Sequence, residues 1–217
     1  MATLLPDLEE RSVPTSGYGE PPVGRGVSGG DWEPWHPERR RQSTYAIGML
    51  VAFGASSMFF LALISASVVH KGLSPNNWMT LQLPSILWLN SSLAIISSLT
   101  LFRARQLFKR GDESGFSLWW SATAVLGVGF LVGQVLAWRQ LAAAGLYMRT
   151  NPSVGFFYVL TVSHGLHLLG GVIALLWIKY RRSPIVGQRT ATFVAALYWH
   201  FVTGLWLFLF LFFLLGD

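Results

Sequence analysis

Five long apolar segments, separated by short charged connections, constrain this chain more than any other feature of its sequence. They cover approximately residues 46–69, 84–102, 118–138, 155–178 and 191–215, and none has an Asp, Glu, Lys or Arg well inside it. A helix needs about 20 apolar residues to cross a hydrocarbon core about 30 Å thick. The sequence therefore predicts an all-α integral membrane bundle of five transmembrane helices.

The composition narrows the class of protein further. With 52% hydrophobic and 12% charged residues, the chain is too apolar for an ordinary soluble domain. It has no cysteine, which excludes disulfides, thiolate metal sites, iron–sulfur clusters and covalent haem attachment through a C-x-x-C-H motif. A net charge of +6 can indicate nucleic-acid binding, but in a membrane protein excess Lys and Arg mark cytoplasmic loops. We therefore expect no nucleic-acid partner.

The distribution of Lys and Arg predicts the orientation in the membrane. With five spans, the amino-terminal region, the 103–117 loop and the 179–190 loop lie on one side and carry thirteen of these residues. The other side carries three, which are Lys71, Arg139 and Arg149. Positively charged loops stay in the cytoplasm, so the amino terminus is expected to be cytoplasmic and the carboxyl terminus outside.

Residues 1–42 differ from the rest of the chain. They are rich in Gly, Pro and charge and have no helical or strand periodicity, so they cannot bury a core of their own. We expect an extended or disordered cytoplasmic arm at 1–42, followed by a five-helix membrane domain at 43–217.

The polar side chains inside the predicted spans are few. They comprise several hydroxyls together with His164, His167, His200, Asn90 and Gln134. His167 and His200 are predicted to lie at similar depths, which permits bis-histidine haem ligation or a metal site. Hydrogen bonds between helices are the alternative, and we favour it because no intramembrane carboxylate supports a ligand role. The lack of repeats and buried charges also disfavours a transporter.

Small residues mark a further feature of the third segment. Gly129 and Gly133 are four residues apart, a spacing that lets two helix backbones approach closely. This pattern indicates a helix bundle rather than a particular function.

Four of the segments resemble a known family. "ALYWHFVTGLWLFLF" resembles the last helix of subunit III of cytochrome c oxidases and related haem–copper oxidases, where Tyr-Trp-His-Phe-Val is followed by Asp and then Trp-Leu-Phe. "FFYVLTVSHGLHLLGGV" and "LWLNSSLAIISSLTL" resemble two other helices of that family, and "GMLVAFGASSMFFLALISASVV" resembles the first helix of its short, five-helix forms. The likeness covers roughly residues 45–217. The matching positions in the first three segments are Tyr198, Trp199, His200, Phe201, Val202, Trp206, Leu207 and Phe208; Thr161, His164, Gly165, His167 and Gly170 or Gly171; and Asn90, Ser97 and Ser98.

The resemblance implies an accessory role. Family members carry no haem or copper themselves, pack mainly against the catalytic subunit I with subunit II in the same complex, enclose lipid in an interhelical cleft, and help to sustain proton uptake. It implies a multi-pass protein of a bacterial inner (plasma) membrane, with structural phospholipid and without catalytic or metal-ligating residues of its own. Candidate helix-packing or lipid-cleft residues are His164, His167, His200, Thr203, Trp199, Trp206, Asn90 and Ser57.

Alternative functions remain at this stage. The same fold serves in quinol oxidases and in nitric oxide reductase-type complexes. Because other subunits bind the electron donor, the sequence of this chain does not reveal which donor is used. From other classes, a haem-binding membrane cytochrome and a small transporter are the alternatives.

Two positions depart from the family pattern. The family commonly has Glu before Met-Phe-Phe in the first of these helices, and this chain has Ser57 there. The family has Asp after Tyr-Trp-His-Phe-Val, and this chain has Thr203. An acid–base role for those carboxylates therefore does not carry over, whereas a structural role for Thr203 does.

Overall fold

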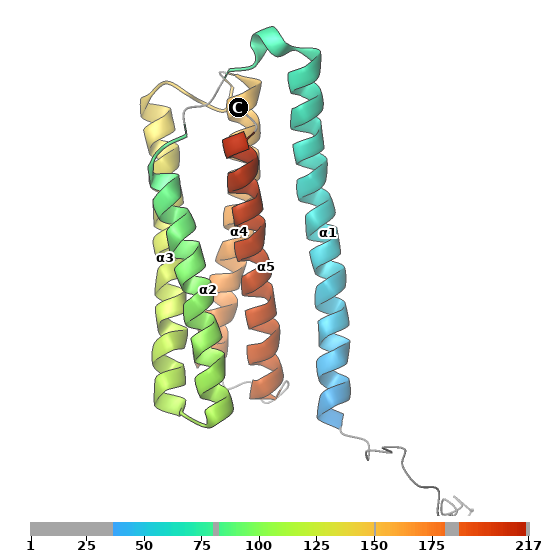
Figure 1. The fold of residues 1–217 in the computed structure, drawn as a ribbon, viewed down its shortest axis with the longest axis vertical. Coiled ribbons are helices and arrows are strands. Elements are labelled where there is room, and N and C mark those ends of the chain that lie inside the picture. The colour runs from blue at the N-terminus through green and yellow to red at the C-terminus, as the bar shows by residue number, and fades with distance from the viewer. Residues whose placement is uncertain (1–36, 80–82, 150, 181–186, 216–217) are drawn as a thin grey trace, which may run out of the picture. The chain divides into compact units, whose positions relative to one another are not determined.

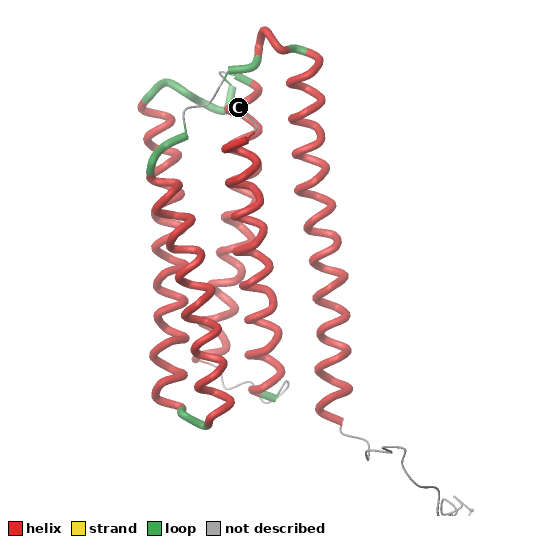
Figure 2. Tube along the Cα trace, in the orientation of Figure 1, coloured by secondary structure: helices red, strands yellow, loops and turns green. Residues whose placement is uncertain are grey.

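Five long helices make up the described part of the chain, as Figure 1 shows. The computed structural model describes residues 37–79, 83–149, 151–180 and 187–215, with the backbone alone at 37–43 and at residue 77. The helices are α1 (Pro37–Leu73), α2 (Ile86–Arg110), α3 (Glu113–Ala143), α4 (Pro152–Tyr180) and α5 (Gln188–Leu215), with a short 3₁₀ helix η1 (Pro75–Asn77) after α1. No strand occurs in these described ranges (Figure 2). All five helices are long and apolar enough to cross a membrane, which confirms the predicted all-α bundle.

The helices extend beyond the predicted spans. Residues 37–42, which we expected in the arm, form the first turns of α1, and the rest of the predicted arm lies outside the described residues. The second predicted span was expected to begin at Pro84, but α2 begins at Ile86 and the Pro84 carbonyl accepts a hydrogen bond from the Leu87 N–H at 3.0 Å. Backbone hydrogen bonding continues past the apolar segment wherever caps permit it, so the edge of an apolar run does not mark the end of a helix.

The turn between α2 and α3 illustrates such caps. Gly111 follows α2 in the left-handed conformation (φ 78°), and its N–H donates to the carbonyls of Leu107 and Phe108. Asp112 precedes α3, and its Oδ1 accepts a hydrogen bond from the Gly115 N–H at 2.9 Å. A left-handed Gly ends a helix without side-chain strain, and an Asp cap satisfies a free N–H at the start of the next. Together they reverse the chain within two residues and place α2 and α3 side by side.

Consecutive helices run antiparallel (Figure 1). The start of α1, the α2–α3 turn, the end of α4 and the start of α5 lie at one end of the helical part, and the end of α5 lies at the other. The predicted charge asymmetry is visible here for the described residues. Lys71, Arg139 and Arg149 lie toward one end, and toward the other lie Arg103, Arg105, Lys109, Arg110, Lys179 and Arg189.

Helices α2 to α5 share one core, whereas α1 joins it only at its margin. The largest fully buried side chains of α2–α5 include Trp120, Trp199 and Trp206. Helix α1 contributes Phe60 and Ile64 to a second, smaller apolar cluster with residues of α4 and α5. Of the most apolar stretch of each helix, 11% of residues are buried in α1, against 33–44% in the other four.

Candidate functional site

Two tryptophans of the last helix are anchored to serines of the second. The indole Nε1 of Trp199 donates to Ser97 Oγ at 3.1 Å, and that of Trp206 donates to Ser91 Oγ at 3.1 Å. Each serine hydroxyl donates its own hydrogen to a backbone carbonyl of α2, so its oxygen can accept the indole N–H. An indole N–H buried in an apolar bundle needs such a partner. The predicted helix-packing residues Trp199 and Trp206 therefore join α5 to α2.

His200 makes a third connection between the same two helices. Its Nδ1 lies 2.6 Å from Ser98 Oγ, and the side chain is half-buried. His200 thus contacts α2, as expected of a hydrogen bond that bridges two helices.

Polar side chains also join α2 to α3. Asn90 Nδ2 donates to Gln134 Oε1 at 3.3 Å, and Thr100 and Thr123 share a hydrogen bond at 2.9 Å. Gly133 makes room for the amide, because a Cβ at that position would lie 2.0 Å from Asn90 Oδ1. Among the described residues, Asn90 Oδ1 and Gln134 Nε2 have no hydrogen-bond partner. Asn90 therefore lies where α2 and α3 approach closely, at Gly133.

His167 connects α4 to α1. Its Nδ1 lies 2.8 Å from the carbonyl of Ser163 on the same helix, and its Nε2 lies 3.3 Å from Ser56 Oγ on α1. Because a carbonyl only accepts, Nδ1 carries the proton and Nε2 accepts from the serine hydroxyl. Tyr198 of α5 adds a hydrogen bond at 2.8 Å to the His167 carbonyl. This places one histidine where α1, α4 and α5 meet.

His164 lies in the interior, three residues before His167. Its ring packs between Phe130 of α3, at 5.8 Å between centroids, and Trp206 of α5, at 5.1 Å. Its Nδ1 has no hydrogen-bond partner among the described residues. A cavity of about 10 Å³ beside it is also lined by Ser97 and Thr203. Thr203 is thus a buried residue of the bundle interior.

The three intramembrane histidines do not converge on one site. His200 contacts α2, His167 contacts α1, and His164 is enclosed by aromatic rings of α3 and α5. In the described ranges no group of three or more His, Cys, Asp or Glu side chains is arranged to hold a metal ion. The geometry therefore favours hydrogen bonding between helices for His167 and His200, and packing among aromatic rings for His164.

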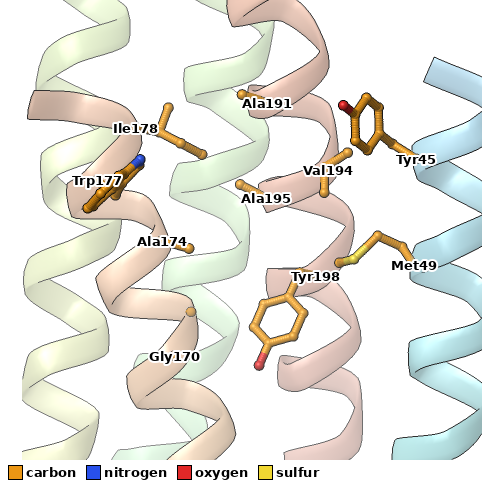
Figure 3. A pocket seen from close by; sticks show the side chains of 11 residues that line it. Tyr45, Met49, Gly170, Ala174, Trp177, Ile178, Ala191, Val194, Ala195 and Tyr198 are labelled. Carbon is orange, nitrogen blue, oxygen red and sulfur yellow. The ribbon is translucent and has the colours of Figure 1, made fainter. Parts of the chain in front are cut away.

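An apolar groove separates the first half of α1 from α4 and α5. It has a volume of about 490 Å³ and is lined by residues of all three helices. Figure 3 shows Tyr45 and Met49 of α1 facing Val194 and Tyr198 of α5, with Ala174 of α4 farther along the wall. Ligand pockets of this size and apolar character suit hydrocarbon groups.

Ser57 lines a second groove, of about 340 Å³, farther along α1. Its other lining residues are apolar and come from α1 and α5, including Phe60, Phe201 and Gly204. Ser57 and Thr203, the two positions where the resemblance implies missing carboxylates, consequently face different environments. The first borders an open groove between α1 and α5, and the second lies inside the bundle.

Several connecting residues were missed from the sequence. Trp120 Nε1 donates to the Leu175 carbonyl at 2.9 Å, Trp138 Nε1 donates to Thr161 Oγ1 at 3.1 Å, and Ser56, not its neighbour Ser57, bonds to His167. A signal was available for the tryptophans, since an indole N–H that is buried in a helix bundle needs an acceptor. No sequence signal distinguishes Ser56 from Ser57.

The helices and their internal hydrogen bonds define a polytopic α-helical membrane protein, and comparison with known proteins defines its family. A protein named "Cytochrome c oxidase subunit 3" from Synechocystis sp. is 32% identical over 187 residues, which cover 81% of this chain and 75% of the relative. One of the same name from Thermostichus vulcanus is 32% identical over 185 residues, covering 81% and 86%. A "Probable cytochrome c oxidase subunit 3" from Nocardia farcinica is 29% identical over 180 residues, covering 78% and 87%. No protein-family model matches the chain.

The chain belongs to the cytochrome c oxidase subunit 3 family. It is therefore an integral membrane protein and a subunit III of the haem–copper oxidase type, as the resemblance predicted.

Proposed function

We propose that this chain is the accessory, non-catalytic subunit III of a respiratory cytochrome c oxidase, supporting subunit I in oxygen reduction coupled to proton pumping. One observation carries the proposal. Three polar side chains of α5, the helix that resembles the last helix of the family, form hydrogen bonds inside the chain. Trp199, His200 and Trp206 are each bonded to a serine of α2. Groups held in this way stabilise a scaffold, whereas catalytic groups must face a substrate or cofactor. Haem and copper belong to the partner subunits.

Subunit I is the main partner in this proposal, with subunit II in the same complex. Both belong to the plasma membrane of a bacterium, and the Lys and Arg distribution directs the amino terminus of this chain to the cytoplasm. Cytochrome c is the favoured electron donor, since the relatives described above are named for it. Quinol would then be the substrate of more distant complexes.

Support for proton pumping is indirect in this proposal. The hydroxyls of Ser57 and Thr203 do not ionise at physiological pH, so neither replaces a carboxylate as an acid or base. The chain would therefore sustain proton uptake by stabilising the arrangement of subunit I and its surrounding lipid.

The groove between α1, α4 and α5 would hold a phospholipid acyl chain. Its volume of about 490 Å³ and its apolar lining suit hydrocarbon, and residues of three helices surround it. Such a lipid would fill the space beside α1, where packing within the chain is sparse.

Affinity purification through this chain in mild detergent tests the assembly. We expect subunits I and II and oxygen consumption with reduced cytochrome c to follow the tag. Purification with a nitric oxide reductase-type catalytic subunit, or with an oxidase that accepts only quinol, would replace the proposed complex by one of the alternatives.

Lipid analysis of the purified complex tests the groove. Ala174→Leu fills the exposed wall of the groove, and Ala66→Leu makes the same change on an exposed site of α1 outside it. We expect the first variant to lose about one bound phospholipid per chain and the second to lose none. Equal lipid content in the two variants would exclude the groove as a lipid site.

A further inference from the structure

A pocket that differs from both apolar grooves lies between the end of α2 and the start of α5. It has a volume of about 390 Å³. Its lining residues are Arg105, Phe108 and Lys109 from α2 and Arg189, Thr192 and Phe193 from α5. Three cationic side chains and two aromatic rings thus line the same pocket.

No carboxylate neutralises these cations within the described part of the chain. Only Asp112 and Glu113 are acidic among the residues whose side chains are described, and neither lines the pocket. Asp112 is occupied, since it accepts hydrogen bonds from Ser114 Oγ at 2.8 Å and from the Gly115 N–H. The pocket therefore presents an excess of positive charge to whatever enters it.

Arg105 is held in place although no acidic side chain of the described residues pairs with it. Its side chain is half-buried, and its guanidinium carbon lies 5.2 Å from the centre of the Phe193 ring. Stacking on an aromatic face orients a guanidinium and leaves its N–H groups available for planar anions. A half-buried cation is costly unless an anion completes its environment.

The pocket lies near the ends of both helices, a position that fits the depth of lipid headgroups. Arg105 is five residues from the end of α2, and Phe193 is five residues from the start of α5, at the end of the bundle that carries most of the cations. Five helical residues correspond to about 7.5 Å, which is similar to the thickness of the polar layer on one side of a bilayer.

The pocket is also separate from the apolar groove between α1, α4 and α5. On α5 the groove uses Ala191, Val194 and Tyr198, whereas the pocket uses Arg189, Thr192 and Phe193. At 100° per residue these two sets occupy opposite faces of the helix.

We propose that this pocket binds the phosphate headgroup of an anionic phospholipid. Arg105 and Arg189 would contact the phosphate oxygens, Lys109 would add positive charge at the rim, and Phe108 and Phe193 would contact the first carbons of the acyl chains. Basic pockets between transmembrane helices on the cytoplasmic side commonly recognise such headgroups. The two rings distinguish a lipid from free phosphate, because inorganic phosphate gains nothing from an apolar wall.

Native mass spectrometry of the purified oxidase complex tests the site. The complex would be exchanged into detergent containing phosphatidylglycerol, phosphatidylcholine or inorganic phosphate. The variants would be Arg189→Gln, Arg105→Gln and the double variant, with Arg103→Gln as the control, since Arg103 is an exposed cation of the same helix outside the pocket. Ala174→Leu in each background would remove the contribution of the apolar groove.

We expect wild type and Arg103→Gln to retain phosphatidylglycerol. The double variant should bind it at least tenfold more weakly, which corresponds to about 1.4 kcal/mol, because the charge-assisted hydrogen bonds to the phosphate are lost. Arg105→Lys should retain more phosphatidylglycerol than Arg105→Gln, because it keeps the positive charge. If Arg105→Gln fails to assemble, Arg189→Gln alone should still reduce occupancy, since Arg189 is exposed.

Three outcomes would overturn the proposal. Equal retention of phosphatidylcholine would show that charge is not recognised, and equal protection by inorganic phosphate would show that no lipid is required. Absence of anionic lipid from every complex, with the pocket filled by a carboxylate of a partner subunit, would assign it to a protein interface. None of these outcomes bears on co-purification with subunits I and II, so failure here is distinct from failure of the proposed function.

Discussion

Helix α1 and the block formed by α2–α5 are built differently. Within the block, neighbouring helices are joined by side-chain hydrogen bonds, such as those of Trp199, Trp206 and Thr100, around fully buried aromatic rings. Among described side chains, α1 is joined to the block by one hydrogen bond, from Ser56 to His167, and by ring contacts such as Phe53 stacked on Phe201 at 4.2 Å. Both apolar grooves open along α1.

Helix α1 and the α2–α5 block therefore contribute differently to the bundle. In lipid the hydrophobic effect does not hold helices together, so packing and hydrogen bonds between helices decide which of them form a rigid unit. The block satisfies both conditions on its own. The rest of the described chain leaves most of the apolar surface of α1 uncovered, and α1 forms one wall of the groove proposed to hold an acyl chain.

Removing a buried tryptophan should cause the largest loss of stability. Trp206→Ala leaves a cavity beside His164 and Phe130 and removes the hydrogen bond to Ser91. We expect the free energy of unfolding to fall by about 2–4 kcal/mol in a dodecyl sulfate titration of the purified chain in mixed micelles. Trp119→Ala, at a residue that is 37% exposed, is the control and should lose much less. Similar losses in both variants would contradict a core centred on Trp206.

A smaller but sharper effect is expected at the contact of α2 with α3. A Cβ at Gly133 would lie 2.0 Å from Asn90 Oδ1, whereas a Cβ at Gly129 would lie 3.9 Å from its nearest neighbour. Gly133→Ala should therefore cost about 1–3 kcal/mol in the same titration, and Gly129→Ala should be close to neutral. Equal effects of the two substitutions would show that the close approach at Asn90 does not exist.

Loosening α1 should have a modest effect. Ser56→Ala removes the hydrogen bond to His167, and such bonds in membranes contribute about 0.6 kcal/mol. Because the chain has no cysteine, a cysteine pair placed across α1 and α4 reports their separation through its rate of disulfide formation. We expect Ser56→Ala to change that rate and Ser57→Ala to leave it unaltered. A loss from Ser56→Ala as large as that from Trp206→Ala would remove the distinction between α1 and the block.

The smallest effect should come from the cap of α3, outside the membrane. Hydrogen bonds from the Gly115 N–H and the Ser114 hydroxyl hold the pKa of Asp112 below its usual range. A lowered pKa in the folded state contributes stability above the unfolded pKa of about 3.9, and this contribution is lost as the pH falls through the folded pKa. The stability difference between wild type and Asp112→Ala should therefore shrink between pH 6 and pH 3. A difference that grows with acidity would contradict the cap.

The fold was predictable from the sequence because apolar length and charge spacing act locally. Five apolar runs of sufficient length can form only helices in a membrane, and the structure has five. Helix ends were less predictable, since the Asp112 cap starts α3 five residues before the predicted span.

The side-chain contacts of the site depend on tertiary packing, which spacing alone does not determine. His164 and His167 are three residues apart on α4, a spacing that places two side chains on neighbouring positions of a helix. The angle of about 60° between their directions nevertheless sends one into the aromatic interior and the other to α1. Ser57 was named because it stands where the family has Glu, whereas the hydrogen bond of Ser56 to His167 depends on how α1 packs against α4.

The most direct test of the accessory role is a reduced-minus-oxidised absorption spectrum of the chain alone, compared with that of the complex purified through it. We expect a haem signal in the complex and none in the isolated chain, because His167 and His200 are bonded to serines on different helices. A haem signal that follows the isolated chain and disappears in His167→Leu or His200→Leu would contradict it.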